Sequence, residues 1–310
     1  MTTRIPEVYW TLACLLTAVA LATLVGLALR RLRPGDPAIA DLNARIRPWW
    51  ALIGIGGGAL LAGREALVLL FAALSFLALR EFLAPARPGD RASLLFCFFV
   101  ALPVQYLLAW SGWLGVFAVW IPVLCLPVLA VTDALFAGVY RFLERTAGTF
   151  WGLLVCVYFL SHIPALMALR IPGYERRMPL LVVYLVLIAQ VSDVLQYIWG
   201  KLIGKRKVAP ELSPSKTIEG LVGGVLSATL VGALSWRLTP FTRWQSGSIA
   251  FLIAILGFAG GLVMSAVKRD RGIKDWSRLI GGHGGMLDRL DSLCFPAPVF
   301  FYLVRSFFSR

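Results

Sequence analysis

Residues 178–200 read MPLLVVYLVLIAQVSDVLQYIWG, and this stretch decides the fold class. Its apolar run approaches the roughly 20 helical residues that cross a hydrocarbon core of about 30 Å. A polar stripe interrupts the run near its end, where Ser192 and Gln196 are four residues apart and share a helix face, with Asp193 beside them. An ionisable residue inside a span is costly and marks a functional candidate, although it can also pair with a neighbouring helix purely for assembly.

Similar apolar runs recur along the whole chain. We count ten candidate spans, of which the second, near 49–63, is short and glycine-rich. They are centred near residues 19, 56, 74, 101, 122, 158, 189, 228, 257 and 299. Continuous runs are not the alternating pattern of a strand barrel, and 59% hydrophobic residues with a mean hydropathy of +0.80 exclude an ordinary soluble domain. The sequence therefore predicts an all-α, polytopic integral membrane protein with nine to ten transmembrane helices.

The basic residues are unevenly distributed between the two sides of the predicted membrane. Of the 30 Lys and Arg residues, 21 fall in the loops that follow the first, third, fifth, seventh and ninth spans. The positive-inside bias places these loops in the cytoplasm and both termini outside, as expected for a bacterial-type inner membrane. The net charge of +14 is then explained by topology and by contact with anionic membrane lipid, and no nucleic acid partner is expected. The first span lacks a small-residue cleavage site, so we expect it to remain a membrane helix.

The two parts of the chain differ in chemistry. Residues 1–170 have short loops with little catalytic chemistry and are interpreted as a scaffold of transmembrane helices, whereas residues 171–310 carry the candidate site. In the scaffold, Glu81 and Asp133 lie near span ends, where solvated or snorkelling carboxylates are expected. His162 is expected to serve helix packing. The five cysteines are scattered without metal-ligand spacing and are interpreted as small apolar residues.

A basic, hydroxyl-rich loop follows the stretch that opens this section. Residues 200–224 carry four basic residues before Pro210 and then Ser213-Pro-Ser-Lys-Thr217, which enters a helix expected to start near Ile218. Hydroxyls, a lysine and free N–H groups at a helix N-terminus form a phosphate cradle. The alternative is a positive-inside anchor followed by a simple helix cap, and the loop alone does not decide between the two.

A second polar segment, residues 265–291, reads SAVKRDRGIKDWSRLIGGHGGMLDRLD. Asp288 and Asp291 are three residues apart and share a helix face, a spacing that suits Mg²⁺ bound together with substrate phosphates. Acidic residues also favour a helix N-terminus through the macrodipole alone. The glycines around His283 allow close approach of the backbone to a ligand, and we therefore favour a metal or nucleotide role for this segment.

The basic side chains of the same segment suit phosphate groups. Lys268 and Arg269 end the ninth span, where cations also favour a helix C-terminus. Together with Lys216, Lys274 and Arg289 they supply enough positive charge for a triphosphate and a lipid phosphate. Nucleotidyl transfer depends mainly on such electrostatic clamping and in-line positioning, with little covalent work by the protein.

The order and spacing of these residues resemble the signature of the phosphatidate cytidylyltransferases (CDP-diacylglycerol synthases). One matching block reads Ser265-x-x-Lys268-Arg269, Lys274-Asp275 and His283-Gly284-Gly285-x-x-Asp288-Arg289-x-Asp291-Ser292. The other runs from Asp193 through Gly200-Lys201 and Gly204-Lys205 to Ser213-Pro-Ser-Lys216-Thr217-x-Glu219-Gly220. The N-terminal half matches this family only as a set of hydrophobic spans.

The resemblance implies an Mg²⁺-dependent membrane enzyme, with room for a second cation, that converts CTP and phosphatidate or a related lipid phosphate to CDP-diacylglycerol and pyrophosphate. The catalytic residues that it implies are Asp193, Lys216, Lys268, Asp275, His283 and Asp288. The implied substrate-binding residues are Ser213, Ser215, Thr217, Arg269, Lys274 and Arg289, and the implied metal ligands are Asp193, Asp288 and Asp291. No general base is required, since the lipid phosphate is already an anionic nucleophile, and the roles of Asp275 and His283 stay open. A homodimer is a further hypothesis.

The chain also departs from the family pattern. Gly261 stands where the resemblance leads us to expect an aspartate, Ser215 replaces a glycine, and Trp276 and Ser277 stand where Ser-Gly is commoner. The missing carboxylate motivates a second hypothesis, a catalytically weakened paralogue that binds lipid phosphate or nucleotide. A transporter is a third hypothesis, but the polar residues cluster in one half of the chain, whereas transporters often show repeated halves.

Overall fold

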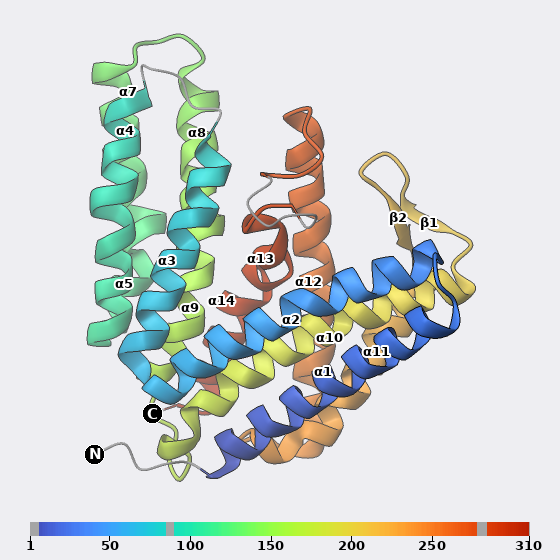
Figure 1. Ribbon diagram of the computed structural model, residues 1–310. Helices are drawn as coiled ribbons and strands as arrows, with labels where there is room; N and C mark the ends of the chain where they lie inside the picture. The colour runs from blue at the N-terminus through green and yellow to red at the C-terminus, as the bar shows by residue number, and fades with distance from the viewer. Residues whose placement is uncertain (1–5, 85–89, 278–283, 310) are drawn as a thin grey trace. The chain divides into compact units, whose positions relative to one another are not determined.

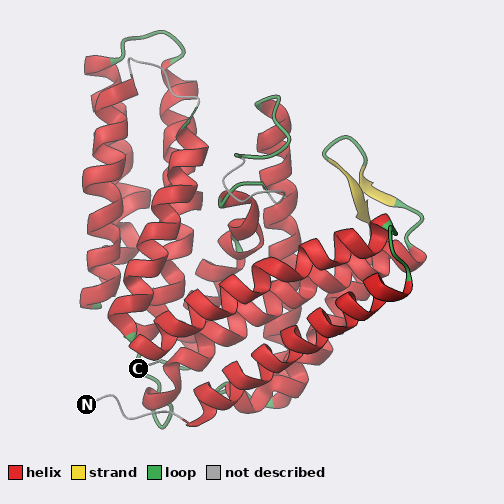
Figure 2. Cartoon of the chain, viewed as in Figure 1, coloured by secondary structure: helices red, strands yellow, loops and turns green. Residues whose placement is uncertain are grey.

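The computed structural model describes residues 6–84, 90–277 and 284–309 and is built almost entirely of helices (Figures 1 and 2). The predicted all-α architecture is confirmed. The chain forms two compact units, Met1–Leu70 and Phe71–Arg310. The predicted chemical division at residue 170 stays a prediction, because it concerns function rather than packing.

The first unit is a pair of long helices followed by the start of a third. α1 (Pro6–Leu32) and α2 (Pro37–Ala62) pack together, and α3 (Arg64–Leu83) begins in this unit and ends in the next. Trp50 Nε1 donates to Thr23 Oγ1 at 3.1 Å and thereby joins α2 to α1. Side-chain hydrogen bonds of this kind fix the register of two helices that otherwise present apolar surfaces to each other.

The second unit continues with three interrupted helices. The segments are α4 (Arg91–Phe96), η2 (Cys97–Ala101) and α5 (Leu102–Ser111); α6 (Leu114–Val119), η3 (Trp120–Cys125) and α7 (Leu126–Phe136); and α8 (Phe142–Leu153), η4 (Leu154–Phe159), α9 (Leu160–Ala165) and η5 (Leu166–Ala168). In each, a short π-helical segment joins two α-helical parts. Prolines within or just after these segments remove a backbone N–H, which locally disturbs the α-helical ladder.

Buried polar side chains hold these helices together. Asp133 of α7 is only 1% exposed and accepts hydrogen bonds from Ser93 of α4 and Thr146 of α8. The expectation of a solvated carboxylate at this position is therefore wrong, because two hydroxyl donors replace its hydration. His162 lies buried among aromatic rings and its Nδ1 is 2.7 Å from the Tyr158 carbonyl, which agrees with the expected packing role.

Three long helices form the frame of the C-terminal part. They are α10 (Met178–Ile203), which follows η6 (Glu175–Arg177); α11 (Ile218–Leu234), which ends in η7 (Ser235–Leu238); and α12 (Arg243–Asp270). Tyr184 of α10 donates to the Ser246 carbonyl of α12 at 2.6 Å, and Ser246 Oγ donates to the Gly232 carbonyl of α11 at 2.7 Å. These buried bonds join all three helices at one level.

A hairpin and two shorter helices complete the unit. A two-stranded antiparallel hairpin, β1 (Lys207–Ala209) and β2 (Ser213–Thr217), connects α10 to α11 (Figure 2). The sequence predicted only a loop there. The chain ends in α13 (Leu287–Cys294) and α14 (Pro296–Phe307), which are separated at Phe295.

Eight of the ten expected spans are confirmed as helices that are long and apolar enough to cross a membrane, counted over the described residues. They are Glu7–Leu32, Arg64–Leu83, Arg91–Ser111, Leu114–Phe136, Phe142–Ala168, Glu175–Ile203, Ile218–Leu238 and Arg243–Asp270. The expected second span corresponds to the shorter apolar helix Trp49–Ala62, and the tenth is divided between α13 and α14. These two crossings stay predictions.

Candidate active site

Glycines let α10 and α11 approach each other closely, and this contact positions the hairpin that connects the two helices. A Cβ on Gly224 would overlap Gln196, and one on Gly220 would lie 2.7 Å from the Gln196 carbonyl oxygen. Thr217 caps α11 by accepting a hydrogen bond from the Gly220 N–H at 3.1 Å. The structure thus shows Thr217 acting as a helix cap, and the predicted helix start at Ile218 is confirmed.

Lys216, the residue before this cap, extends from β2 to α12. Its Nζ lies 4.6 Å from the centre of the Phe258 ring and 3.5 Å from the Phe258 carbonyl oxygen. A Cβ added to Gly261 would be 2.9 Å from the same Nζ. Burial lowers the pKa of Lys216, while the neighbouring Asp291 and Asp193 carboxylates oppose this effect. The ammonium group therefore occupies the space beside Gly261, where the sequence departs from the expected aspartate.

Small residues on α12 bring α13 to the same place. A Cβ on Gly260 would lie 2.7 Å from the Asp291 carbonyl oxygen, and one on Gly257 would lie 3.1 Å from that of Ser292. Asp193 of α10 accepts a hydrogen bond from the Ser292 hydroxyl, and Asp193, Asp291 and Lys216 interact electrostatically. Two of the predicted carboxylates and one predicted lysine therefore meet where α10, β2, α12 and α13 converge.

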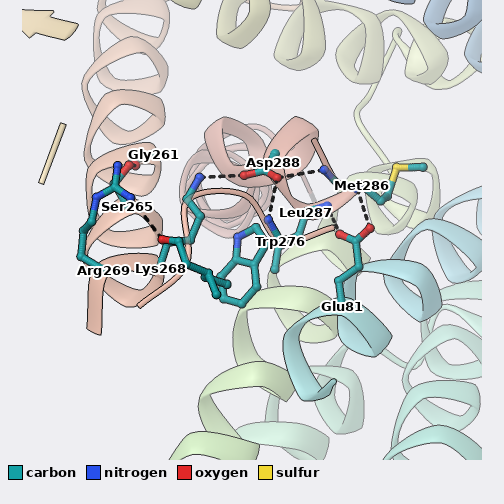
Figure 3. Close-up of polar contacts among 11 residues, drawn as sticks. Glu81, Gly261, Ser265, Lys268, Arg269, Trp276, Met286, Leu287 and Asp288 are labelled. Carbon is teal, nitrogen blue, oxygen red and sulfur yellow. Dashed lines mark hydrogen bonds and ion pairs between the residues drawn. The ribbon is translucent and has the colours of Figure 1, made fainter. Parts of the chain in front are cut away.

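Asp288 has a different environment. Its Oδ1 accepts a 2.7 Å hydrogen bond from Lys268 Nζ, and its Oδ2 accepts bonds from the N–H groups of Trp276 at 3.0 Å and Gly285 at 2.9 Å (Figure 3). Gly284 adopts φ +77°, and a Cβ there would lie 2.8 Å from Asp288 Oδ2. Asp288 thus joins the end of α12 to both sides of the glycine-rich segment.

A residue outside both motif blocks completes this arrangement. Glu81 at the end of α3 accepts hydrogen bonds from the N–H groups of Met286 and Leu287, each at 2.9 Å (Figure 3). It also accepts one from Ser277 Oγ at 2.6 Å. Its side chain is buried, with 9% exposure. The expectation of a solvated or snorkelling carboxylate is therefore wrong. The available sequence signal was only an acidic residue at the end of an apolar run, which does not reveal its distant partners.

Aromatic and cationic groups pack beside Glu81. The Arg271 guanidinium lies 4.0 Å from the centre of the Phe82 ring and 5.4 Å from that of Trp276, and the two rings are 5.2 Å apart. Arg271 also donates to the Phe82 carbonyl. Trp276, which departs from the family pattern, is thus a buried contact between α3 and the segment that follows α12.

The remaining predicted residues that the structure describes are exposed or half-buried. Ser213 is half-buried on β2, and Ser215 is exposed. The exposed basic and acidic candidates on and after α12 are Arg269, Lys274, Asp275 and Arg289. Arg269 donates to the Ile273 carbonyl at 3.1 Å. His283 lies outside the described residues.

The described residues do not form a metal cage made of protein alone. Among the residues that the structure describes, no three histidine, cysteine, aspartate or glutamate side chains are grouped closely enough to hold an ion. Asp193 and Asp291 nevertheless interact with each other. Because Mg²⁺ is usually bound through one or two carboxylates plus substrate phosphates, this pair fits an ion that binds together with a nucleotide. The predicted metal roles of Asp193, Asp288 and Asp291 all stay predictions.

The chain also matches a known protein family along most of its length. Residues 43–307, most of the 310-residue chain, match the pattern of the cytidylyltransferase family. The chain belongs to the cytidylyltransferase family. The family resemblance predicted from the motif blocks is thus confirmed, and membership supports a nucleotidyltransferase that is integral to the membrane.

Individual cytidylyltransferase relatives differ in how much of the chain they match. The uncharacterized protein YnbB of Escherichia coli is 37% identical over 298 residues, which is 95% of this chain and 97% of that protein. The phosphatidate cytidylyltransferases of Synechocystis sp. and Staphylococcus haemolyticus are 43% identical over 115 residues and 38% identical over 120 residues. These alignments cover 36% and 38% of this chain, and only 39% and 46% of the two enzymes.

Proposed function

We propose that this cytidylyltransferase transfers CMP from CTP to phosphatidate, which yields CDP-diacylglycerol and pyrophosphate for phospholipid biosynthesis. The observation that carries the proposal is that Lys216 Nζ and Asp291 Oδ2 lie on the same side of Gly261 and both interact with Asp193, so that residues of both motif blocks come together. The identity to named phosphatidate cytidylyltransferases supports it. We place the reaction at the cytoplasmic face of a bacterial-type inner membrane, on the basis of the positive-inside bias.

The proposed reaction is a phosphoryl-group displacement. A phosphate oxygen of phosphatidate attacks the α-phosphorus of CTP, and the bond between that phosphorus and the oxygen bridging to the β-phosphorus breaks, so that pyrophosphate leaves. The lipid phosphate is already ionised at neutral pH, and no side chain has to remove a proton from it. The protein therefore has to bind, orient and neutralise two anionic substrates.

The basic residues divide this work between them. Lys216 extends from the hairpin to α12, where its ammonium can contact a phosphate oxygen beside Asp291. Lys268 is held in a fixed orientation by its 2.7 Å bond to Asp288. Arg269, Lys274 and Arg289 are exposed and are proposed to contact the outer phosphates, with Ser213 and Ser215 supplying hydroxyl donors.

Asp193 and Asp291 are the proposed ligands of Mg²⁺. The ion, when bound, would polarise phosphoryl oxygens and neutralise charge that develops on them. Asp291 interacts electrostatically with Asp193, Lys216 and Lys268, so carboxyl and ammonium groups lie together in the site. Such a pattern suits a metal–nucleotide complex, whose cation and phosphates replace these internal contacts.

A weakened paralogue is the second proposal, and it rests on Gly261. A Cβ at this position would lie only 2.9 Å from Lys216 Nζ and 3.8 Å from Asp291 Oδ2. The ammonium therefore occupies space that an aspartate side chain would need. In this second proposal, Lys216 neutralises the remaining carboxylates and the chain binds lipid phosphate or nucleotide with little turnover.

One assay separates the two proposals. Purified full-length protein in detergent receives labelled CTP, phosphatidate and Mg²⁺, and CDP-diacylglycerol and pyrophosphate are measured. Equal release of both products supports the enzyme, whereas binding of both substrates without product supports the paralogue. Lys216→Met should abolish turnover, while Lys207→Met, which removes an exposed lysine of the same hairpin that is not a matched motif position, serves as the matched control. Diacylglycerol, which lacks the attacking phosphate, should give no product.

A further inference from the structure

Glu81 binds the first amides of α13 although it lies about 200 positions earlier in the chain. Met286 is the N-cap residue of α13 and Leu287 is its first residue, and the Met286 side chain makes no capping hydrogen bond. The first N–H groups of a helix have no partner within the helix, and they carry a partial positive charge. A carboxylate satisfies both needs. Here the cap comes from α3, so the start of α13 is tied to a helix outside the motif blocks.

Gly285 allows this contact. Its φ is not in the left-handed region, so its backbone would accept any residue. A Cβ on Gly285 would nevertheless collide with the Glu81 carboxylate. The side chain is therefore excluded by the approach of Glu81 rather than by backbone conformation. This contrasts with Gly284, whose φ of +77° itself favours glycine.

Glu81 and Asp288 act on adjacent parts of one segment. Three consecutive amides point to carboxylates: that of Gly285 to Asp288, and those of Met286 and Leu287 to Glu81. On the other side of the segment, Asp288 accepts from the Trp276 N–H and Glu81 accepts from Ser277 Oγ. The same two carboxylates therefore bind both Trp276-Ser277 and Gly285-Met286-Leu287.

These hydrogen bonds connect Glu81 to two carboxylates of the proposed site, Asp288 and Asp291. Asp288 follows Leu287 directly and bonds Lys268, and Asp291 lies one helical turn further along α13. A shift at the start of α13 would therefore move Asp288 and Asp291 together. Displacements of about 1 Å at supporting positions can lower a rate about 100-fold.

We propose that Glu81 is a positioning residue of the transferase site, which sets the placement of Asp288 and Asp291 by capping α13 from α3. This inference rests on the proposed function, because its kinetic consequence is measured as CDP-diacylglycerol synthesis. The contact itself is independent of any reaction. Experiments can therefore refute the structural contact and the proposed function independently of each other.

The kinetic experiment compares Glu81→Gln, Glu81→Asp and Glu65→Gln. Glutamine has the same shape but only one acceptor oxygen, so we expect kcat to fall about 10- to 100-fold with a smaller change in KM for CTP. Aspartate retains the charge and should recover part of kcat. Glu65 is exposed on the same helix, and its substitution should leave kcat unchanged. A Glu81→Gln enzyme within about twofold of the wild-type kcat would overturn the proposal.

A second measurement does not require turnover. Hydrogen–deuterium exchange of the peptide containing Met286 and Leu287 should accelerate in Glu81→Gln, with little change in helices α5 and α7. If the wild-type chain makes no CDP-diacylglycerol, the proposed function fails, and this exchange still reports on the contact. Unchanged exchange in folded Glu81→Gln protein would refute the cap itself.

A double-mutant cycle tests the contact with Gly285. Gly285→Ala should accelerate hydrogen–deuterium exchange of the Met286 and Leu287 amides, because the new methyl group displaces the Glu81 carboxylate that protects them. In a Glu81→Ala background the same substitution should have little further effect, since the carboxylate is absent. When two residues are in contact, the losses of amide protection caused by the two substitutions do not add. Fully additive losses would contradict the proposed geometry.

Discussion

Replacing Asp288 by asparagine removes the central acceptor of the site. The carboxylate binds Lys268 Nζ at 2.7 Å, with both side chains mostly buried at 10% and 13% exposure, and it also accepts two backbone N–H groups. Asparagine keeps one acceptor oxygen. Its NH2 group must then face either Lys268 or the N–H groups of Trp276 and Gly285. All of these are donors, so at least one hydrogen bond is lost and two donors are brought together.

These contacts determine how much stability and turnover the Asp288→Asn protein should lose. A hydrogen bond to a charged group contributes about 1.5–3 kcal/mol, and breaking a buried ion pair costs about 3–5 kcal/mol. Both side chains retain some exposure, so we expect a loss near the lower end, about 2–4 kcal/mol in the free energy of unfolding. If the same interaction is needed in the transition state, turnover falls by on the order of 100-fold.

Two assays test this reasoning. Thermal unfolding in detergent should show a lower midpoint for Asp288→Asn, and the CTP–phosphatidate assay should show the loss of turnover. Asp270→Asn, an exposed aspartate at the end of α12, is the matched control. Lys268→Met combined with Asp288→Asn should lose less than the sum of the single losses. Additive losses, or an Asp288→Asn protein with wild-type midpoint and turnover, would refute the assigned role.

Three further predictions concern the surroundings of this site. Gly261→Asp should displace the Lys216 ammonium from beside Gly261 and lower the Mg²⁺ concentration for half-maximal turnover about tenfold, because a third carboxylate tightens cation binding; an unchanged Mg²⁺ titration would count against a cation beside Asp291. Chelation of Mg²⁺ should stop turnover reversibly while the unfolding midpoint changes little, since Lys216 already neutralises nearby carboxylates; a large drop in the midpoint would indicate a structural metal instead. Gly284→Ala should lower turnover, as the left-handed conformation costs an L-residue about 1–2 kcal/mol and its Cβ would lie 2.8 Å from Asp288; wild-type kinetics would contradict this.

Much of the fold and part of the site could be predicted from local patterns. Continuous apolar runs specify helices that cross a membrane, because only an internally bonded backbone is stable there. The shared face of Ser192 and Gln196 is confirmed by their 2.8 Å hydrogen bond, and the helix beginning at Ile218 is also confirmed. These features depend on residues three or four positions apart, so the sequence contains the geometry.

Other features depend on contacts between distant segments. Glu81 has the same local sequence whether its carboxylate is solvated or buried, and only the packing of α3 brings it to Met286 and Leu287. In the same way, the motif shows that Lys216 precedes a helix cap but not that it reaches Gly261.

The sequence by itself therefore determined the membrane helices, the family and the set of charged groups from which a phosphate site is made. The tertiary structure decided the partners of those groups: Lys268 for Asp288, Lys216 for the space beside Gly261, and Glu81 for the start of α13. The physical reason is that a buried carboxylate must find donors to replace its hydration. Which donors it finds depends on how the helices pack, and local sequence does not encode that.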